Sequence, residues 1–233
     1  MRADEAIILV GGRGTRLQSV ISDVPKPLAP VAGRPFLSWV LDHLDASGIR
    51  KVILATGYMA EQVASYVGDT WGDMSVSYSV EDGPLGTGGA VRQASGLLQG
   101  DTVHILNGDT FLRYAPSELE AATSQAGGTI GVALARVDDI ARYGSVVVRD
   151  DRVLRFREKG GHGPGLVNAG SYFFTTAALG QLERGKAFSL ETEVLEPQTE
   201  QGNVIAFTQT SAFIDIGVPE DYERAQSLFG EKT

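Results

Sequence analysis

Short continuous apolar runs alternate with helically spaced apolar residues through the first half of the chain. Four runs fit buried strands, because they are apolar and bounded by turn residues: residues 6–10, 51–56, 75–81 and 102–109. Three segments between them have helical spacing or a glycine-rich helix start: residues 35–49, 60–67 and 87–98. Strands that alternate with helices predict a parallel sheet with right-handed crossovers.

The second half of the chain is mostly β-rich. Its expected strands lie within residues 129–137, 145–157, 168–175 and 204–217. Asp150 and Asp151 predict a hairpin turn, and residues 219–229 begin with proline and two acidic residues, as a helix start does. The glycine-rich loop over 160–165 is expected to stay unpacked and mobile. We therefore expect an α/β half and a mixed half that share one sheet.

The composition fits a folded protein with a sizeable core. The 233 residues suit one large α/β domain or two small ones, and 42 % of them are hydrophobic against 21 % charged. No apolar run approaches the roughly 18 residues that a membrane span needs, and the amino-terminal run is too short for the core of a signal peptide. The chain has no cysteine, which excludes disulfides and thiolate metal sites. We expect a cytoplasmic protein with no membrane contact.

The charge balance changes the expected partners. Twenty Lys and Arg against 29 Asp and Glu give a formal net charge of −9. A protein that coats nucleic acid needs a basic footprint, so we expect no nucleic-acid partner. Most of the acidic side chains are expected to form a solvated surface. Basic residues beside glycine loops are then noteworthy, because their positive charge is opposite to the net negative charge of the protein.

Three of the expected strands end in residues that suit ligand binding. Gly11 and Gly12 follow the first strand, residues 81–89 follow a later one, and residues 107–109 (Asn-Gly-Asp) end another. In open α/β sheets, ligands bind outside the carboxyl ends of the strands. We expect these three segments to meet at one site.

The first glycine loop does not match the standard phosphate-binding motifs. No P-loop string occurs in the chain, and a dinucleotide fingerprint would need glycine where Leu17 stands. Glycines alone also fit an ordinary strand-to-helix turn. However, freed backbone N–H groups bind anions, Arg16 can grip two phosphate oxygens, and Lys26 is held between Pro25 and Pro27. This combination favours a triphosphate site.

The glycine loop GGRGTRL is followed by PKP, and then in order by EDGPLGTGGA, LNGDT, REK, NAG and FIDIG. Together these motifs resemble the sugar-1-phosphate nucleotidylyltransferase family (nucleoside-diphosphate-sugar pyrophosphorylases), over nearly the whole chain. The resemblance implies a Rossmann-like three-layer α/β/α fold with a mixed, mainly parallel central sheet. It implies a single domain over residues 1–233, in which about residues 1–125 bind nucleotide and about 126–233 bind sugar.

The resemblance implies attack by a sugar 1-phosphate oxygen on the α-phosphorus of a nucleoside triphosphate, with release of pyrophosphate. Catalysis then rests on positioning and charge neutralisation, and the catalytic residues are Arg16, Lys26 and Asp109. Asp109 and Asp215 match the aspartates that bind Mg²⁺ in the family. Either aspartate alone also fits a turn cap. Both together, in the family's register, favour the metal.

The binding residues are also implied by the resemblance. The expected nucleotide-binding residues are Leu9, Gly11, Gly12, Gly14, Thr15, Arg16, Glu81, Leu85, Gly86, Thr87, Gly88, Asn107 and Gly108. The expected sugar-phosphate-binding residues are Gly144, Glu158, Lys159, Asn168 and Gly170. Lys159 would pair with the sugar phosphate, and Glu158 and Asn168 would bind sugar hydroxyls. Many relatives have proline after the Glu-Lys pair, whereas Gly160 and Gly161 follow it here. We expect the glycine-rich loop over 160–165 to close over the sugar.

Within the family, the motifs look most like those of the guanylyltransferases of D-glycero-α-D-manno-heptose 1-phosphate, which implies GTP and this heptose phosphate as substrates, for surface polysaccharide synthesis. A mannose-1-phosphate guanylyltransferase, or a short uridylyl- or thymidylyltransferase for another hexose, is the alternative. A catalytically silent regulatory subunit is a second alternative, but it should lack a clamp residue or a metal aspartate. A dehydrogenase is disfavoured by the missing third glycine.

Some remaining residues fit plainer roles. His43, His104 and His162 are too scattered for a metal site, and His43 is expected on a helix surface. Phe36, Val40 and Leu44 share a helix face that fits either the core or a homodimer contact.

Overall fold

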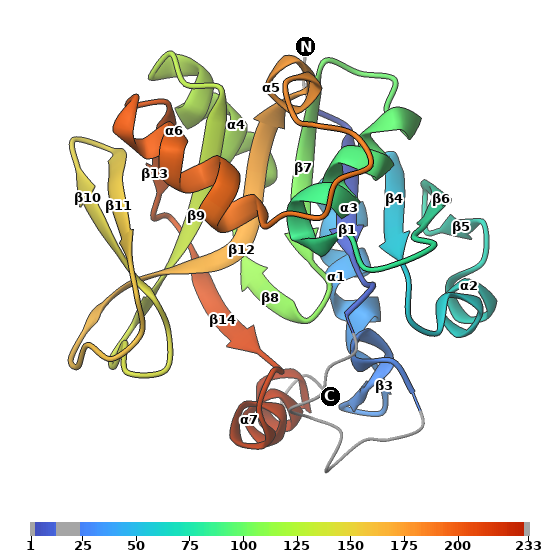
Figure 1. Cartoon of the computed structure of the whole chain (residues 1–233). Coiled ribbons are helices and arrows are strands. Elements are labelled where there is room, and N and C mark those ends of the chain that lie inside the picture. The colour runs from blue at the N-terminus through green and yellow to red at the C-terminus, as the bar shows by residue number, and fades with distance from the viewer. Residues whose placement is uncertain (1–2, 13–23, 231–233) are drawn as a thin grey trace.

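The computed structural model describes residues 3–12 and 24–230, with helices on both faces of a central sheet (Figure 1). Within these residues the sheet has ten strands, in the order β10-β11-β13-β9-β12-β7-β1-β4-β6-β5. Their bounds are β1 (Glu5–Leu9), β4 (Lys51–Thr56), β5 (Thr70–Trp71), β6 (Met74–Val80), β7 (Thr102–Asn107), β9 (Ile130–Val137), β10 (Ser145–Arg149), β11 (Arg152–Arg157), β12 (Gly165–Thr175) and β13 (Val204–Phe207). Two small sheets pair β2 (Pro30–Val31) with β3 (Arg34–Pro35), and β8 (Thr110–Arg113) with β14 (Ser211–Asp215).

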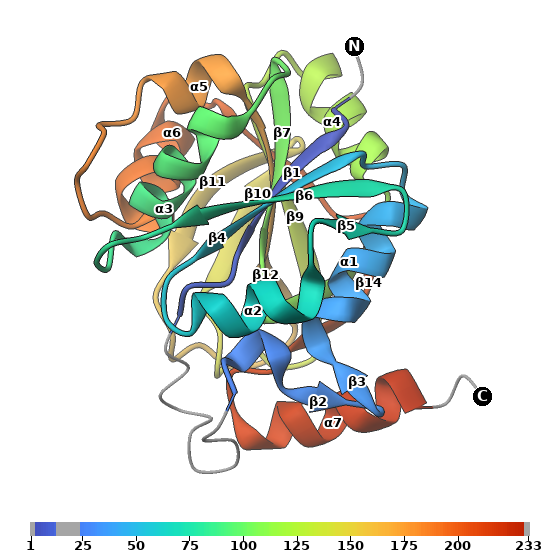
Figure 2. The ribbon, with the colours of Figure 1, turned by 90° about the vertical axis from the view of Figure 1, so that its right-hand side faces the viewer.

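The helices form the two outer layers (Figure 2). One face carries α1 (Phe36–Ala46), α2 (Ala60–Val67) and α4 (Pro116–Gln125), and the other carries α3 (Gly86–Ala94), α5 (Thr176–Gly180) and α6 (Glu196–Glu200). The closing helix α7 (Pro219–Gly230) packs beside β2. Single turns of 3₁₀-helix span Lys26–Leu28 (η1) and Ser95–Leu97 (η2), and a π-helical turn spans Glu191–Leu195 (η3).

Alternation along the strands fills both sides of the sheet. In β1, Ile7 packs into the cluster beneath α3, whereas Ile8 packs into the cluster beneath α1. Both side chains are fully buried. Successive strand residues point to opposite faces, so a strand that is covered on both faces must be apolar throughout. This explains why the first strand is a continuous apolar run in the sequence.

The expected three-layer α/β/α fold is confirmed, and the sheet is mixed. Its parallel part is more limited than expected. Strands β7, β1, β4 and β6 are mutually parallel, and β9 pairs in parallel with β13. Strand β12 runs antiparallel to both β7 and β9, and β10 and β11 form an antiparallel hairpin. The term "mainly parallel" therefore fits only the part of the sheet that β7, β1, β4 and β6 form.

The structure corrects several element bounds. The helix expected over 35–49 ends at Ala46, and the one expected over 87–98 gives way to a 3₁₀ turn after Ala94. The strand expected to reach 109 ends at Asn107, because Gly108 and Asp109 form the turn into β8. The segment 204–217 forms two strands, β13 and β14, in different sheets.

Two further expectations need correction, and one is confirmed. The loop over 160–165 does pack: Gly163 accepts a hydrogen bond from the Ile140 amide, and its own amide donates to Asp139. His43 does not lie on an open helix surface, because its ring packs against the rings of Phe111 and Tyr114. The hairpin turn at Asp150–Asp151 is confirmed, and both residues have positive φ angles, as a primed hairpin turn requires.

The helix face of Phe36, Val40 and Leu44 belongs to the core, since all three side chains are buried. In the part of the chain that the structure describes, no helix has the length and apolar character needed to cross a bilayer.

Candidate active site

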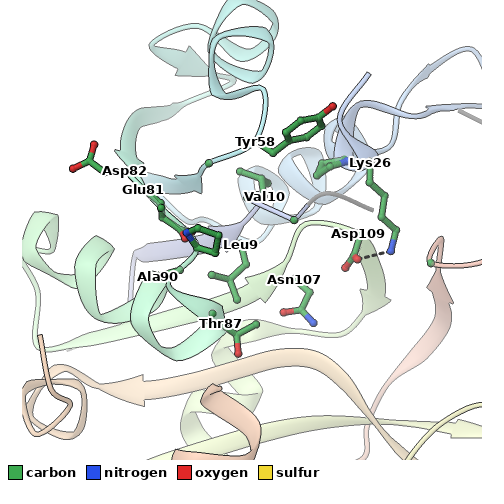
Figure 3. A pocket seen from close by; sticks show the side chains of 18 residues that line it. Leu9, Val10, Lys26, Tyr58, Glu81, Asp82, Thr87, Ala90, Asn107 and Asp109 are labelled. Carbon is green, nitrogen blue, oxygen red and sulfur yellow. Dashed lines mark hydrogen bonds and ion pairs between the residues drawn. The ribbon is translucent and has the colours of Figure 1, made fainter. Parts of the chain in front are cut away.

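A cavity of about 700 Å³ lies at the carboxyl ends of four neighbouring parallel strands. Residues that follow β1, β4, β6 and β7 line it, together with Lys26 and Gly217 (Figure 3). Of the expected site residues, nine line its wall: Leu9, Gly11, Gly12, Lys26, Glu81, Gly86, Thr87, Asn107 and Asp109. This is the edge at which open α/β sheets bind ligands. The three strand ends that were expected to bind a ligand therefore meet at this cavity.

The frame around Lys26 is rigid. Pro25 adopts an extended conformation with φ −62° and ψ 144°, and its carbonyl accepts the Leu28 amide at 2.8 Å. Pro27 and Leu28 are buried beneath this 3₁₀ turn. The two prolines fix their φ angles, and the buried Pro27 and Leu28 hold the turn in place. The backbone of Lys26 is therefore restrained, and mainly its side chain can move. Its ammonium points into the cavity toward Asp109 (Figure 3).

Asp109 and Asp215 come from distant parts of the chain and meet through a two-stranded sheet. In the antiparallel pair of β14 with β8, Asp215 lies opposite Thr110, the residue that follows Asp109. The Ile216 amide also donates to the Asp109 carbonyl at 3.0 Å. The backbone thus fixes the two carboxylates beside each other, whatever binds between them.

One ammonium holds both carboxylates. Lys26 Nζ lies 2.5 Å from Asp109 Oδ2 and 3.6 Å from Asp215 Oδ1. Burial raises the pKa of Asp215, and the neighbouring charge of Asp109 raises it further, whereas Lys26 and the Gly217 amide oppose this rise. Two carboxylates that repel each other at a half-buried site favour a cation between them.

The same pair suits a divalent cation. Hard carboxylate oxygens are the ligands that such ions prefer, and a small ion can take two of them while substrate phosphates and water supply the rest. Within the described ranges, no group of three or more His, Cys, Asp or Glu side chains gathers as an all-protein metal cage. A site completed by substrate phosphates needs no such cage.

The segment after β6 forms the far wall of the cavity. Glu81 Oε2 accepts a hydrogen bond from the Leu85 amide at 2.9 Å, which orients the carboxylate toward Gly11. Gly86 and Thr87 line the cavity, whereas Leu85 and Gly88 do not. Gly88 is buried against the Phe188 ring, and a Cβ there would come within 2.1 Å of it. Gly88 is thus required for packing, which the sequence motif alone does not reveal.

The expected sugar-phosphate residues lie outside the wall of the cavity: Asn168 and Gly170 within β12, Gly144 just before β10, and Glu158 and Lys159 just after β11. Ser145 pairs with Arg157 in β11 and with Val167 in β12. Gly144 directly precedes this pairing, and a Cβ on it would lie 2.8 Å from the Arg157 carbonyl oxygen. Glu158 and Lys159 are exposed.

Two residues of β12 connect this cluster to the cavity. Asn168 Oδ1 accepts the Gly170 amide at 3.0 Å, and its Nδ2 donates to the Tyr172 hydroxyl at 2.9 Å. Gly170 has a φ of +63°, and a Cβ there would lie 2.5 Å from Asn107 Nδ2. This close approach at the bulge of β12 brings the expected sugar cluster against the end of β7.

The family model for nucleotidyl transferases matches residues 5–232. The chain belongs to this family. It is 40 % identical to a D-glycero-alpha-D-manno-heptose 1-phosphate guanylyltransferase of Aneurinibacillus thermoaerophilus, over 95 % of this chain and 96 % of that protein. It is also 40 % identical to the enzyme of the same name from Campylobacter jejuni, over 94 % of this chain and 96 % of that one. The crystal structure of HddC from Yersinia pseudotuberculosis complexed with GMP-PN matches with a TM-score of 0.86 and 34 % identity, over 98 % of this chain and all of that one.

Members of the nucleotidyl transferase family generally use a divalent metal ion, which agrees with the Asp109–Asp215 pair. Asn107 adds a second polar feature to this site. Its Oδ1 is buried without a hydrogen-bond partner among the described residues, although the residue lines the cavity. Buried polar atoms are normally paired, so this oxygen suits a donor supplied by a ligand or a bound water.

Three expected residues of this nucleotidyl transferase, Gly14, Thr15 and Arg16, lie outside the described residues. Gly108 is described but stands behind the wall, where its amide donates to the Leu9 carbonyl at 2.9 Å. Its role in the structure is to pack β7 against β1.

Three more lining residues, Asp82, Gly83 and Pro84, belong to the segment 81–89 that was expected at the site. The sequence did not point to the remaining ones: Val10, Pro27, Gly57, Tyr58, Ala90 and Gly217. A signal was available for Gly57 and Tyr58, because they directly follow the apolar run 51–56. This run forms β4, which lies next to β1 in the sheet. The same strand-end rule that selected Gly11 applies to them. Gly217 could be found from its place two residues after Asp215.

Proposed function

We propose that this protein transfers GMP from GTP to D-glycero-α-D-manno-heptose 1-phosphate, forming GDP-heptose and pyrophosphate. The observation that carries the proposal is the Lys26 ammonium, placed in the wall of the nucleotide-sized cavity between Asp109 and Asp215. Two relatives that this chain matches over nearly their full length bear the name of that enzyme.

The proposed step is a displacement at the α-phosphorus. A non-bridging oxygen of the sugar phosphate forms the new P–O bond, the bond to the β-phosphate bridging oxygen breaks, and pyrophosphate leaves with that electron pair. Because the reacting groups are anions, the protein must align them and neutralise charge. Lys26 would contact the α-phosphate in the transition state, with Arg16 on the leaving phosphates.

For the metal we propose Mg²⁺, held by Asp109 and Asp215 together with phosphate oxygens. The two carboxylates would hold this ion, which would supply positive charge to the phosphate oxygens. Lys26 would be the protein's own cation beside the α-phosphate.

The base is proposed to be guanine because of Glu81. Its carboxylate is held by the Leu85 amide at one oxygen and lies in the cavity wall. A carboxylate can only accept hydrogen bonds. The Watson–Crick edge of guanine presents two neighbouring donors, at N1 and N2, whereas adenine and uracil each present one. Glu81 therefore favours guanine over the other bases.

For the sugar we propose the cluster of Gly144, Glu158, Lys159, Asn168 and Gly170, which belongs to residues 126–233. Its closeness to Asn107 through Gly170 supports a sugar placed next to the α-phosphate. The choice of the heptose rests on the two named relatives. A mannose or other hexose 1-phosphate remains the alternative that the assay must test.

The first experiment is pyrophosphate release by the purified protein with Mg²⁺. GTP, ATP, UTP, CTP and dTTP are each tested against the 1-phosphates of the heptose, mannose and glucose. We expect turnover for GTP with the heptose. Release with a different pair would correct the substrates and keep the chemistry, whereas binding of nucleotide without turnover for any pair would contradict the proposed reaction.

A further inference from the structure

Tyr58 is an aromatic residue of the cavity wall to which the proposed reaction gives no role. It lies in the connection from β4 to α2, and 39 % of the residue is exposed. Of the described residues that line the cavity, Tyr58 alone is aromatic. None of the described residues forms a hydrogen bond or a ring contact with it. An aromatic ring in this position offers its surface to a ligand in the cavity.

The other six of the seven tyrosines have structural roles. Tyr66 is similar to Tyr58 in exposure, at 40 %, but it does not line the cavity. Its hydroxyl lies 2.8 Å from Ser38 Oγ, and its ring lies 6.0 Å from the ring of Trp71. Tyr114 is buried in the core. The remaining ones form hydrogen bonds through their hydroxyl groups: Tyr78, Tyr143, Tyr172 and Tyr222.

The backbone on both sides of Tyr58 is fixed. The Val10 amide donates to the Ala55 carbonyl at 2.9 Å, and the Glu81 amide donates to the Thr56 carbonyl at 2.8 Å, so both neighbouring strands hold the end of β4. Met59 then adopts a left-handed conformation with φ +57° and ψ 36° at the start of α2. Non-glycine residues rarely adopt it, and it persists where the surroundings impose it. Tyr58 is therefore held in place between a strand and a helix.

This placement brings Tyr58 close to Glu81. A Cβ on Gly57, the preceding residue, would lie 3.5 Å from the Gly11 carbonyl oxygen and 3.8 Å from Glu81 Cβ. A Cβ on Gly11 would lie 3.0 Å from Glu81 Oε1. The ends of three strands thus meet at the carboxylate that is proposed to bind the edge of the base. In the view of Figure 3, the Tyr58 ring lies between Glu81 and Lys26.

We propose that Tyr58 stacks on one face of the nucleotide base, while Glu81 holds the edge of the same base. This inference rests on the proposed function and deepens it. Every base has a π face, so stacking supplies affinity for any base, whereas a contact to the edge selects one of them. The ends of β4 and β6 then divide the work, with affinity from Tyr58 and selectivity from Glu81.

The proposal is tested by calorimetry of nucleotide binding, with Mg²⁺ and without sugar phosphate. Tyr58→Ala should raise the Kd of GTP by about 5-fold or more, which is the lower end of the range for base–aromatic stacking. The same variant should bind inorganic tripolyphosphate as the wild type does, because this probe has no base. Tyr58→Phe keeps the ring and should bind GTP with the wild-type Kd.

Tyr66→Ala is the matched control, because it removes a tyrosine of the same exposure from outside the cavity. It should leave the Kd of GTP unchanged. Inosine triphosphate has the fused rings of GTP without the N2 amino group, so it separates stacking from the edge contact. Tyr58→Ala should weaken GTP and inosine triphosphate by the same factor, whereas Glu81→Gln should change the ratio of their Kd values.

Turnover gives a second readout. The loss in Tyr58→Ala should appear in the KM of the nucleotide, with kcat near that of the wild type, because the reacting phosphorus lies away from the base. Tyr58→Leu decides the question if the alanine variant fails to fold. Leucine keeps apolar bulk but has no π face, so this variant should bind GTP more weakly than Tyr58→Phe.

An unchanged Kd of GTP in Tyr58→Ala, or a wild-type Kd in Tyr58→Leu, overturns the inference. An equal loss for GTP and tripolyphosphate also overturns it, since the ring would then act on the phosphates. Pyrophosphate release by the wild type tests the proposed function separately. If it identifies another nucleotide, that nucleotide replaces GTP in the binding measurement, because stacking is not limited to guanine.

Discussion

Lys26 Nζ donates a hydrogen bond of 2.5 Å to Asp109 Oδ2, and the same ammonium lies 3.6 Å from Asp215 Oδ1. The side chain of Lys26 is 10 % exposed, against 35 % for each aspartate. The lysine is thus the buried member of this group, and the carboxylates face the cavity. The ammonium of Lys26 thus balances part of the negative charge of the two carboxylates.

We expect Lys26→Ala to lower kcat/KM for nucleotide transfer by about 10²–10³, as expected for the loss of one preorganised charge donor. The loss should appear in turnover with either substrate limiting. Steady-state pyrophosphate release measures it. The control is Lys186→Ala, whose exposed ammonium pairs only with Glu183 among the described residues and should have near-normal kinetics. An effect limited to the KM of the sugar phosphate would mean that Lys26 does not act at the α-phosphate.

Removal of either cavity carboxylate should abolish most of the activity. Asp109→Ala and Asp215→Ala each take away half of the proposed metal site, so we expect a severe loss of kcat and a higher Mg²⁺ concentration at half-maximal rate. Thermal unfolding should show an intact fold. Asp101→Ala, at an exposed position before β7 and distant from the cavity, is the control. Normal Mg²⁺-dependent turnover in either cavity variant would remove that aspartate from the site.

The choice of base should depend on Glu81. In Glu81→Gln, one acceptor oxygen becomes a donor, which opposes the donors of guanine and suits an acceptor edge. We expect the ratio of kcat/KM for GTP over ATP to fall by about 10-fold or more, because a site built to pair a group discriminates strongly. Asp82→Asn, next to it on the cavity wall, is the control. An unchanged ratio would place base recognition on backbone groups alone.

Asp221 is expected to stabilise the approach to the sugar site. Its carboxylate is 2 % exposed and accepts from Arg142 at 2.8 Å, from Arg224 at 2.5 Å and from the Tyr143 hydroxyl at 3.3 Å. These contacts fix the backbone just before Gly144. Because both arginines are largely exposed, we expect Asp221→Ala to lower the free energy of unfolding by about 1–3 kcal/mol rather than by more.

The same variant should raise the KM of the sugar 1-phosphate more than that of the nucleotide. Arg224→Ala separates the two effects, because it keeps the Arg142 contact and should change stability with little effect on KM. Glu223→Ala, exposed on the same helix, should change neither. Equal KM changes for both substrates would argue against a local effect at Gly144.

The parts of this molecule that the sequence predicts are those governed by local patterns. The run 51–56, the helix near Ala60–Val67 and the hairpin at Asp150–Asp151 each carry their own periodicity or turn chemistry. The strand ends that line the cavity follow from the sheet rule once those strands are placed. The family motifs then add Asp215, which no local pattern would connect to Asp109.

What the sequence did not reveal depends on contacts between distant segments. The helix α4, with Pro116 at its start, carried no prediction, and neither did the π-helical turn at Glu191. The glycines of the α3 start were assigned to the nucleotide, yet Gly88 is needed because Phe188 lies against it. Such a role is visible only when the segment around Phe188 is seen in place, since nothing in the sequence pairs the two.

The stability of the protein should decrease as the medium becomes acidic, because of His43. Burial lowers the pKa of His43, and the charge of Arg113 lowers it further, while a backbone hydrogen bond with Tyr114 acts in the opposite direction. Its Nε2 is buried without a partner among the described residues. Between the lowered pKa of the folded state and the ordinary value near 6.5, the unfolded chain therefore binds more protons than the folded one. The free energy of unfolding then rises with pH in that window, and the contribution of neutral His43 is complete above it.

We expect His43→Gln to flatten this rise, measured as urea unfolding at pH values from 5 to about 8. His162→Gln is the control, since that side chain is exposed on the 160–165 loop, and its profile should follow the wild type. Acid sensitivity that persists unchanged in His43→Gln would assign the effect to other groups. A flattened profile would establish that an imidazole between Phe111 and Tyr114 sets the acid limit of the fold, apart from the chemistry of the cavity.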